Sequence, residues 1–88
     1  MPYIAPAARE RINQTVIGDV KSGAIQMPGE LNYAITKLIA AYCFKQPLSY
    51  QTINDVVGVL ESAKLEFYRR VASPYEDQKI ITNGDVYS

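Results

Sequence analysis

The segment Lys64-Leu-Glu-Phe-Tyr-Arg-Arg70 concentrates the side chains best suited to chemistry. On a helix, Lys64 lies one turn from Tyr68, and Glu66 lies one turn from Arg69 and Arg70. One interpretation is an anion site, in which guanidinium groups bind phosphate oxygens and a tyrosine ring stacks on a base. The other is a solvated helix end, where the arginines pair with Glu66 and complement the C-terminal helix dipole. Rotational symmetry in an oligomer would gather four or more such positive groups around one ligand.

A second polar group, formed by Asn32, Tyr33, Thr36 and Lys37, recurs at one-turn spacing. It is either a solvent-facing stripe or part of a binding surface. The chain has seven tyrosines in 88 residues. Tyrosine is favoured where an apolar ring is buried while the hydroxyl meets water or a partner, which describes both subunit interfaces and ligand pockets.

Catalytic residues are scarce. The chain has no histidine, the commonest general base, and Cys43 lies in an apolar stretch where a thiol more often packs than reacts. Neither glycine-rich phosphate-binding motif occurs. Glu76 and Asp77 are adjacent, which fits a solvated acidic turn better than a cation site. We therefore expect a protein that is not an enzyme, with no catalytic residue, metal site or cofactor.

The length of 88 residues predicts one domain, 1–88, with a thin core. Small domains are often stabilised further by disulfides, metals or partner subunits. Cys43 is the single cysteine, so no disulfide forms within the chain, and the absence of histidine removes the usual zinc ligand sets. We therefore expect self-association into a homo-oligomer, a dimer or a tetramer.

Charge and hydropathy exclude further classes of protein. Nine basic and nine acidic residues cancel, which argues against a protein that binds long nucleic acid. The longest nearly apolar run, Leu38 to Phe44, is far shorter than the ~20 residues that span a bilayer. The first residues lack the basic and apolar regions of a signal peptide. The expected location is the cytoplasm, and no membrane contact is expected.

Apolar periodicity predicts a mainly α-helical fold with three helices and a long third helix. The first helix runs from about residue 6 to 22 and ends at Ser22-Gly23. The second runs from Glu30 to about Phe44. The third begins at Ser49, a plausible N-cap, and continues to about Ala72, where Ser73-Pro74 is expected to end it.

The third helix and the C-terminal segment carry two further expectations. Gly58 and Ser62 form a small face that a second helix could approach closely, or Gly58 is simply tolerated there. If the small face is an interface, Gly58→Leu disrupts assembly. After Pro74, residues 75–78 are expected to form a turn. Residues 79–82 and 85–87 then read as a hairpin around Asn83-Gly84, because Asn-Gly accepts positive φ.

Three blocks of the sequence resemble a family of small proteins of unknown function found in tailed phages and bacteria. The blocks are Gly29-Glu-Leu-Asn-Tyr-Ala-Ile-Thr36, Gly58-Val-Leu-Glu-Ser-Ala-Lys-Leu-Glu-Phe-Tyr-Arg-Arg70, and Pro74-Tyr-Glu-Asp77 followed by Asn83-Gly-Asp-Val-Tyr87. The resemblance covers most of the chain after residue 28. Ser62 departs from it, since relatives are expected to have cysteine there, and the first helix matches less well.

The resemblance implies a phage or prophage accessory protein that acts in the host cytoplasm. Small oligomeric phage proteins include sponges that capture the cyclic nucleotide signals of bacterial defence systems. By analogy of size, oligomery and cationic residues, we expect this chain to sequester a phosphate-bearing cyclic nucleotide at its subunit junctions. The eight expected ligand-binding residues are Arg69, Arg70, Tyr68, Tyr75, Tyr33, Lys37, Lys64 and Asn83.

Two alternatives remain open at this stage. The first is a small helical protein that binds a host or virion protein through its apolar helix faces. The second is a metal-dependent phosphodiesterase that uses Glu61, Glu66, Glu76 or Asp77. A sponge returns its ligand intact, whereas the phosphodiesterase turns it over.

Overall fold

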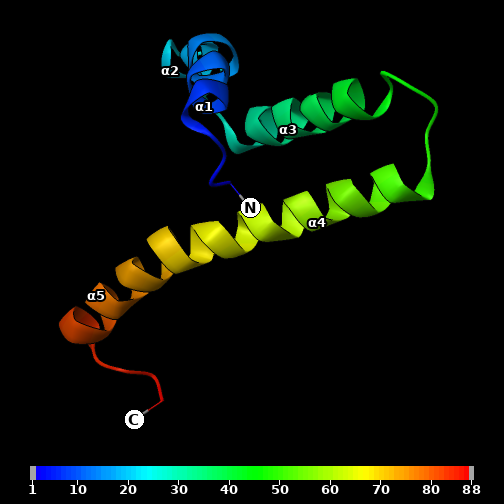
Figure 1. Ribbon diagram of the computed structural model, residues 1–88. Helices are drawn as coiled ribbons and strands as arrows, with labels where there is room; N and C mark the ends of the chain where they lie inside the picture. Colours follow the sequence, from blue (N-terminus) through cyan, green and yellow to red (C-terminus); the bar gives the residue numbers. More distant parts are fainter. Residues whose placement is uncertain (1, 88) are drawn as a thin grey trace. The chain divides into compact units, whose positions relative to one another are not determined.

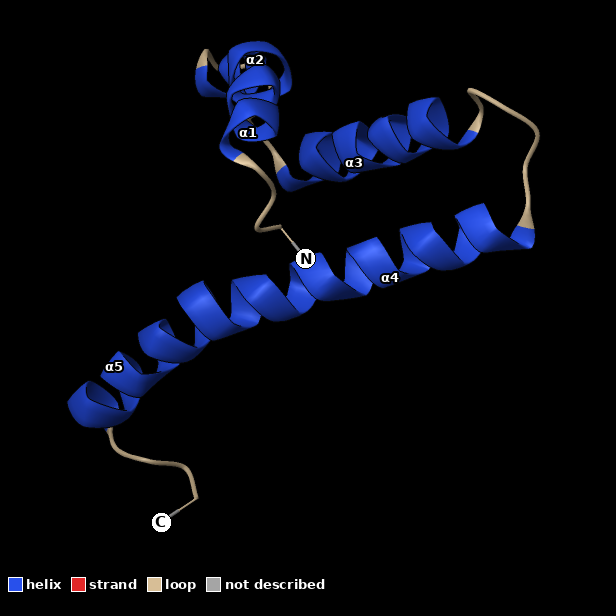
Figure 2. Ribbon diagram, viewed as in Figure 1, coloured by secondary structure: helices blue, strands red, loops and turns tan. Residues whose placement is uncertain are grey.

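The computed structural model describes residues 2–87 and is mainly helical, with no strand in that range (Figures 1 and 2). Met1 and Ser88 lie outside the described residues. The chain divides into two compact units, here called the N-terminal unit (residues 2–56) and the C-terminal unit (residues 57–87). The mainly α-helical prediction is confirmed, whereas the homo-oligomer and the single domain 1–88 stay predictions.

The first predicted helix is a continuous helical run made of three segments: α1 (Pro6–Ile12), the π-helix η1 (Asn13–Ile17) and α2 (Gly18–Lys21). Pro6 occupies the first turn, where its missing N–H costs nothing. Within η1, the Thr15 hydroxyl donates to the Arg11 carbonyl at 2.9 Å, a local bond that competes with the regular helix. Gly23 follows the run with φ of 98°, which fits the predicted end.

Helix α3 (Pro28–Cys43) begins two residues earlier than predicted. Pro28 lies in its first turn, and the Glu30 carboxylate accepts hydrogen bonds from the backbone N–H groups of Gln26 at 2.7 Å and Met27 at 3.3 Å. Backbone N–H groups at the start of a helix have no partner within the helix, and this carboxylate supplies one. Cys43 is buried, one turn after the half-buried Ile39 and Ala40, so one face of this helix is covered.

Helix α4 (Tyr50–Phe67) begins where the sequence predicted. The Ser49 hydroxyl accepts a hydrogen bond from the Thr52 backbone N–H at 3.2 Å, which makes Ser49 the N-cap. An added Cβ at Gly58 meets no atom within 4 Å, so the described chain leaves open space beside this residue.

The prediction that Ser73-Pro74 ends this helix is wrong. The chain passes through the π-helix η2 (Tyr68–Ala72) into helix α5 (Ser73–Asn83) (Figure 1). In an α-helix, Pro74 would lack a donor for the Arg70 carbonyl and its ring would clash with that group. Here the Ser73 N–H donates to the Tyr68 carbonyl, five residues back, and the wider π turn fits the proline into the first turn of α5.

The predicted turn at 75–78 and hairpin at 79–87 are also wrong, because α5 includes residues 73–83. The Gly84 N–H donates to the Ile80 carbonyl at 2.9 Å, so this backbone belongs to the helix end. Of the two residues of the predicted hairpin turn, Gly84 takes positive φ, 91°, whereas Asn83 is the last helical residue. An isolated two-stranded hairpin is marginal in water, whereas α5 extends an existing helix and needs no new nucleus.

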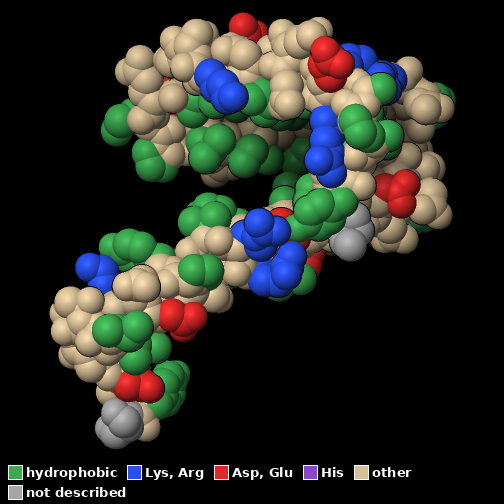
Figure 3. All heavy atoms as spheres, turned by 60° about the vertical axis from the view of Figure 1, so that its left-hand side comes forward, with side chains coloured by type: hydrophobic (Ala, Val, Ile, Leu, Met, Phe, Trp, Pro, Cys, Tyr) green, Lys and Arg blue, Asp and Glu red, His purple; other side chains and the backbone are tan. Residues whose placement is uncertain are grey.

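The described residues bury very little apolar surface. Cys43, at 9% exposure, is the buried apolar side chain among residues 2–87, whereas every helical segment carries large apolar side chains that are more than a third exposed. Hydrophobic side chains are visible on the surface in Figure 3. Contact between water and so many apolar side chains is unfavourable. The helix surfaces that carry these side chains are therefore candidates for association.

Among residues 2–87, no helix combines the length and the apolar character that crossing a membrane requires.

Candidate functional site

The cationic segment, residues 64–70, spans the end of α4 and the start of η2. Lys64 Nζ lies 3.3 Å from Glu61 Oε1, and Arg69 Nη2 lies 3.5 Å from Glu66 Oε1. The expected pairing of Glu66 is therefore seen with Arg69. The helix continues to Asn83, so the arginines lie mid-helix and cannot complement a C-terminal dipole, which acts only over the last turn.

Arg70 differs from its cationic neighbours. It is exposed, and within residues 2–87 it makes no hydrogen bond or ion pair, whereas Lys64 and Arg69 each lie beside a glutamate. An exposed guanidinium carries five N–H donors in a planar fork, a shape that matches phosphate oxygens. Arg70 is therefore the residue of the segment that is most available to an anion.

The cationic segment does not form a pocket within one helix. Lys64 and Tyr68 are one turn apart and share a side of the helix, but residues two positions apart, such as Tyr68 and Arg70, do not face each other. Tyr68 is 54% exposed. A ligand that meets both the Tyr68 ring and the Arg70 guanidinium therefore needs groups from more than one helix.

Tyr75 lies in α5, beyond the π-helix, and its ring is capped by a lysine. Lys79 Nζ lies 5.4 Å from the centroid of the Tyr75 ring, a cation–π contact between residues one turn apart. The sequence analysis missed Lys79 because it placed that residue in a strand, where Tyr75 and Lys79 would not have met. Recognition of the helical spacing after Pro74 would have found it.

Tyr33 and Lys37 lie on α3 in the N-terminal unit, whereas the other six predicted site residues lie in the C-terminal unit. Lys37 Nζ lies 6.0 Å from the centroid of the Tyr33 ring, so the pair repeats the Tyr75–Lys79 arrangement. Tyr33 is 66% exposed. The eight residues therefore stay a prediction as one site. Within the set, Lys64 and Tyr68 lie on the same side of their helix, and Lys37 lies over the Tyr33 ring.

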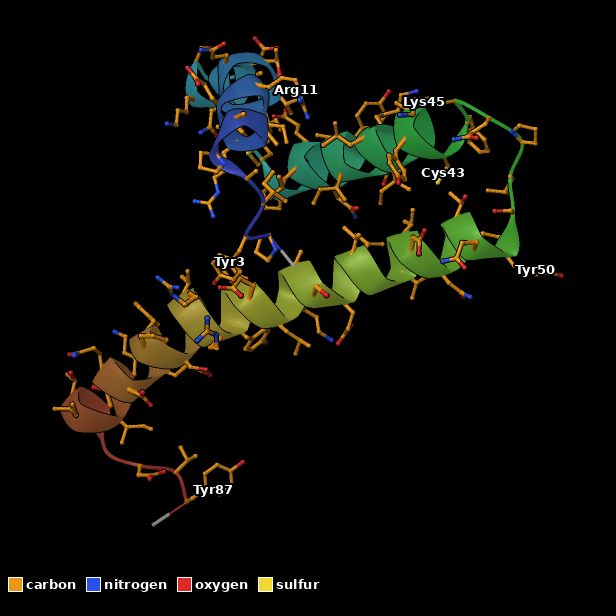
Figure 4. All side chains as sticks on the ribbon, viewed as in Figure 1. Tyr3, Arg11, Cys43, Lys45, Tyr50 and Tyr87 are labelled. Atoms are coloured by element: carbon orange, nitrogen blue, oxygen red, sulfur yellow. The ribbon has the colours of Figure 1, made fainter. Side chains whose placement is uncertain are left out.

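Asn83 lines a different feature, a groove of about 510 Å³ between α5 and the C-terminal tail. Asn83 is 13 positions after Arg70 on the same helical run, which separates their backbones by about 20 Å. Within the tail, the Tyr87 N–H donates to Asp85 Oδ1 at 2.8 Å, and Figure 4 labels Tyr87 there. The groove is lined by Ser73, Glu76, Asp77, Lys79, Ile80, Asn83, Gly84, Asp85, Val86 and Tyr87.

The charge of this groove does not suit a phosphate. Three carboxylates, from Glu76, Asp77 and Asp85, face one ammonium group, from Lys79, so the lining is net negative. An anion would be repelled unless its own charges were neutralised. Asn83 therefore belongs to a different surface from Arg70 within one copy of the chain.

The hydrolytic groups considered among the described residues are four carboxylates and one thiol. Among residues 2–87, no group of three or more histidine, cysteine, aspartate or glutamate side chains is placed to hold a metal ion. Two of the four carboxylates considered for a phosphodiesterase, Glu61 and Glu66, lie beside basic side chains. Cys43 is buried, which suits packing more than nucleophilic attack.

Comparison with known proteins places the whole arrangement in a family. No curated protein and no solved structure matches the chain. A family model described as Domain of unknown function (DUF6899) matches residues 1–86. This match spans both units and includes the cationic segment, the Tyr75–Lys79 pair and every residue that lines the groove except Tyr87. The chain therefore belongs to the DUF6899 family.

Proposed function

We propose that this protein is a non-enzymatic homo-oligomer that binds a small phosphate-bearing ligand where its copies meet. The ligand class is a cyclic nucleotide, and the biological role is that of a phage anti-defence sponge that removes an immune signal in the host cytoplasm. The observation that carries the proposal is Arg70, an exposed guanidinium with no hydrogen-bonding or ionic partner within residues 2–87.

The distribution of charge supports binding by several copies together. One Arg70 in water holds a phosphate weakly, because solvent screens the attraction. Two or more copies around a symmetry axis add their charges, and the low dielectric of a junction strengthens each charge-assisted hydrogen bond. Tyr68 and Arg70 lie on different sides of one helix, so a junction is also the arrangement that brings ring and guanidinium to one ligand.

The tyrosine–lysine pairs support recognition of a nucleotide. In both Tyr33–Lys37 and Tyr75–Lys79, the ammonium group lies near the ring, and both rings remain more than half exposed. A base can stack on an exposed ring while the nearby ammonium attracts a phosphate. Because each pair is formed within one helix, its geometry is set before any ligand arrives.

Isothermal titration calorimetry with 3′,3′-cyclic dinucleotides, cyclic trinucleotides and cyclic ADP-ribose isomers tests this function. At least one ligand is expected to bind, and Arg70→Ala to weaken it by roughly tenfold or more through loss of charged hydrogen bonds. Arg11→Ala is the matched control, because Arg11 is also an exposed arginine on a helix (Figure 4). Absence of heat from every ligand, or equal loss in both variants, rejects the proposal.

Recovery of the ligand separates a sponge from a hydrolase. The complex is denatured, and the released ligand is examined by mass spectrometry. A sponge returns the ligand unchanged, whereas a phosphodiesterase returns linear products. Appearance of linear products that depends on added divalent metal would assign the protein to the enzyme class instead.

A second function, binding of a host or virion protein, is favoured by the exposed apolar side chains on every helical segment. This function uses apolar faces and not the arginine. It predicts that one protein is recovered in stoichiometric amount from infected cells, and that Arg70→Ala leaves this recovery unchanged. Loss of recovery in Arg70→Ala would count against it.

A further inference from the structure

The junction between α5 and the C-terminal tail places a glycine directly after an asparagine. Asn83 is the last residue of α5, and Gly84 follows it with φ of 91° and ψ of 150°. This backbone conformation is open to glycine and strained for a residue with a Cβ. The geometry of the helix end therefore favours glycine at position 84, and the sequence makes Asn83 its neighbour.

An asparagine and the glycine after it can react with each other without an enzyme, which makes asparagine a thermally labile residue. The Gly84 nitrogen attacks Asn83 Cγ, and the bond between Cγ and Nδ2 breaks. The proton of the Gly84 N–H leaves with the amide nitrogen as ammonia, and a five-membered cyclic imide remains. Water then opens this ring. Cleavage between the Gly84 nitrogen and Cγ leaves aspartate, whereas cleavage between that nitrogen and the Asn83 carbonyl carbon leaves isoaspartate.

The structure leaves the reacting groups accessible. Asn83 is exposed, and the neighbouring side-chain hydrogen bonds use other groups: the Thr82 hydroxyl donates to the Gln78 carbonyl at 3.0 Å, and Asp85 Oδ1 accepts the Tyr87 N–H. Apart from its chain neighbours, no described atom lies within 4 Å of a Cβ added at Gly84. The space beside the glycine is therefore open.

One hydrogen bond opposes the reaction. The Gly84 N–H donates to the Ile80 carbonyl at 2.9 Å, and this bond holds the nitrogen at the helix end. The bond closes the last turn of α5, and the terminal bonds of a helix open at little cost in free energy. When it opens, the conformational freedom of glycine lets the nitrogen reach Asn83 Cγ.

The other three asparagines of the chain have a different setting. They lie inside helical segments, Asn13 in η1, Asn32 in α3 and Asn54 in α4, and the residues after them are Gln14, Tyr33 and Asp55. A side chain on the following residue hinders the attack. A helix interior also opens less readily than a helix end. These three residues are therefore internal controls for Asn83.

We infer that Asn83 is a site of spontaneous deamidation in the folded protein, and that the reaction adds a carboxylate to the groove beside those of Glu76, Asp77 and Asp85. A negative charge in the last turn of a helix is unfavourable with the helix dipole. Isoaspartate also adds one carbon to the backbone between α5 and the tail. The reaction therefore changes the charge of the groove and the backbone that leads to its tail side. The inference does not depend on the proposed ligand or on self-association.

Incubation of the full chain in mildly alkaline buffer tests the site. Peptide mass spectrometry measures the conversion of each asparagine with time, in native protein and in urea. Native Asn83 is expected to convert roughly tenfold faster, or more, than Asn13, Asn32 and Asn54, and to give isoaspartate as well as aspartate. Its native rate is expected within about tenfold of its rate in urea, because the helix end opens readily. An Asn83 that stays intact in native protein while the urea sample converts overturns the inference.

Matched variants identify the origin of the new charge. Wild-type protein is expected to accumulate an acidic species on anion exchange, and its aspartate form is expected to elute with Asn83→Asp. Asn83→Gln is expected to abolish this species, because glutamine would have to close a larger ring. Asn32→Gln is the control, an exposed asparagine inside α3, and is expected to leave the species unchanged. Equal accumulation in Asn83→Gln and Asn32→Gln rejects Asn83 as the site.

Discussion

The two units differ in where their apolar side chains can find partners. The N-terminal unit contains α1 with its extension, α3 and the start of α4, and it buries Cys43. The C-terminal unit consists of one helical run, residues 57–83, and a short tail. A lone helix buries almost nothing against itself, and isolated helices are marginal in water. The stability of the second unit must therefore come from groups outside it.

The largest expected difference between the units is in hydrogen exchange. If another copy protects the C-terminal unit, exchange of amides in residues 57–83 speeds up when the protein is diluted below its dissociation constant. Amides of Pro28–Cys43 are expected to change less, because part of their protection is internal. Mass-detected exchange at two concentrations measures this. Equal changes in both regions would remove the distinction between the units.

A buried charge at Cys43 is expected to affect the N-terminal unit strongly. Cys43→Asp places a carboxylate at a position that is 9% exposed and is expected to lower the free energy of unfolding by about 3 kcal/mol. Phe44→Asp is the control, because Phe44 is 71% exposed, and should cost well under about 1 kcal/mol. Urea unfolding followed by circular dichroism measures both. Similar costs would show that Cys43 lies in no core.

Gly58 tests whether the small face that it forms with Ser62 is an interface. Apart from neighbouring backbone of its own helix, nothing lies within 4 Å of an added Cβ, so Gly58→Ala is expected to stabilise the helix by about 1 kcal/mol. If Gly58 is instead simply tolerated on the helix, Gly58→Leu leaves the oligomer intact. Light scattering of Gly58→Leu decides: dissociation would favour the small face formed with Ser62.

The smallest expected effect concerns the exposed ion pair of the cationic segment. Glu61→Gln removes the carboxylate 3.3 Å from Lys64 Nζ, and both side chains are more than half exposed. The expected change in the free energy of unfolding is at most about 0.5 kcal/mol, since solvent screens such pairs. A larger loss, found by urea unfolding, would mean that the pair is covered when copies associate.

Local signals in the sequence were enough to locate most helices. The N-cap at Ser49, the glycine after the first helix and the acidic first turn at Glu30 each act on neighbouring backbone groups. The predicted bounds therefore lie within about two residues of the observed ones for α3, the start of α4 and the first helical run. The paired state of Glu66 was also predictable, because spacing on a helix fixes which charges can meet.

The candidate site was predictable only in part. The pairs Lys64–Tyr68 and Tyr33–Lys37 follow from helical spacing, and the structure retains both on their helices. The wrong strand assignment for residues 79–82 concealed the Tyr75–Lys79 contact and placed Asn83 in a hairpin turn, whereas it is the last residue of α5. Sequence spacing does not reveal how groups on different units or copies come together, since that depends on packing.

The sequence by itself determined the helical class, the balanced charge and the one-turn spacing of the cationic segment, because each depends on residue identity and near neighbours. The tertiary structure decided that the chain continues through Pro74. A proline is compatible with either a helix stop or a new first turn, and the π-helix at Tyr68–Ala72 selects the second by moving the Ser73 donor to the Tyr68 carbonyl. The structure also decided that Cys43 is buried while Val57 and Phe67 are more than half exposed, because burial depends on which surfaces find a partner.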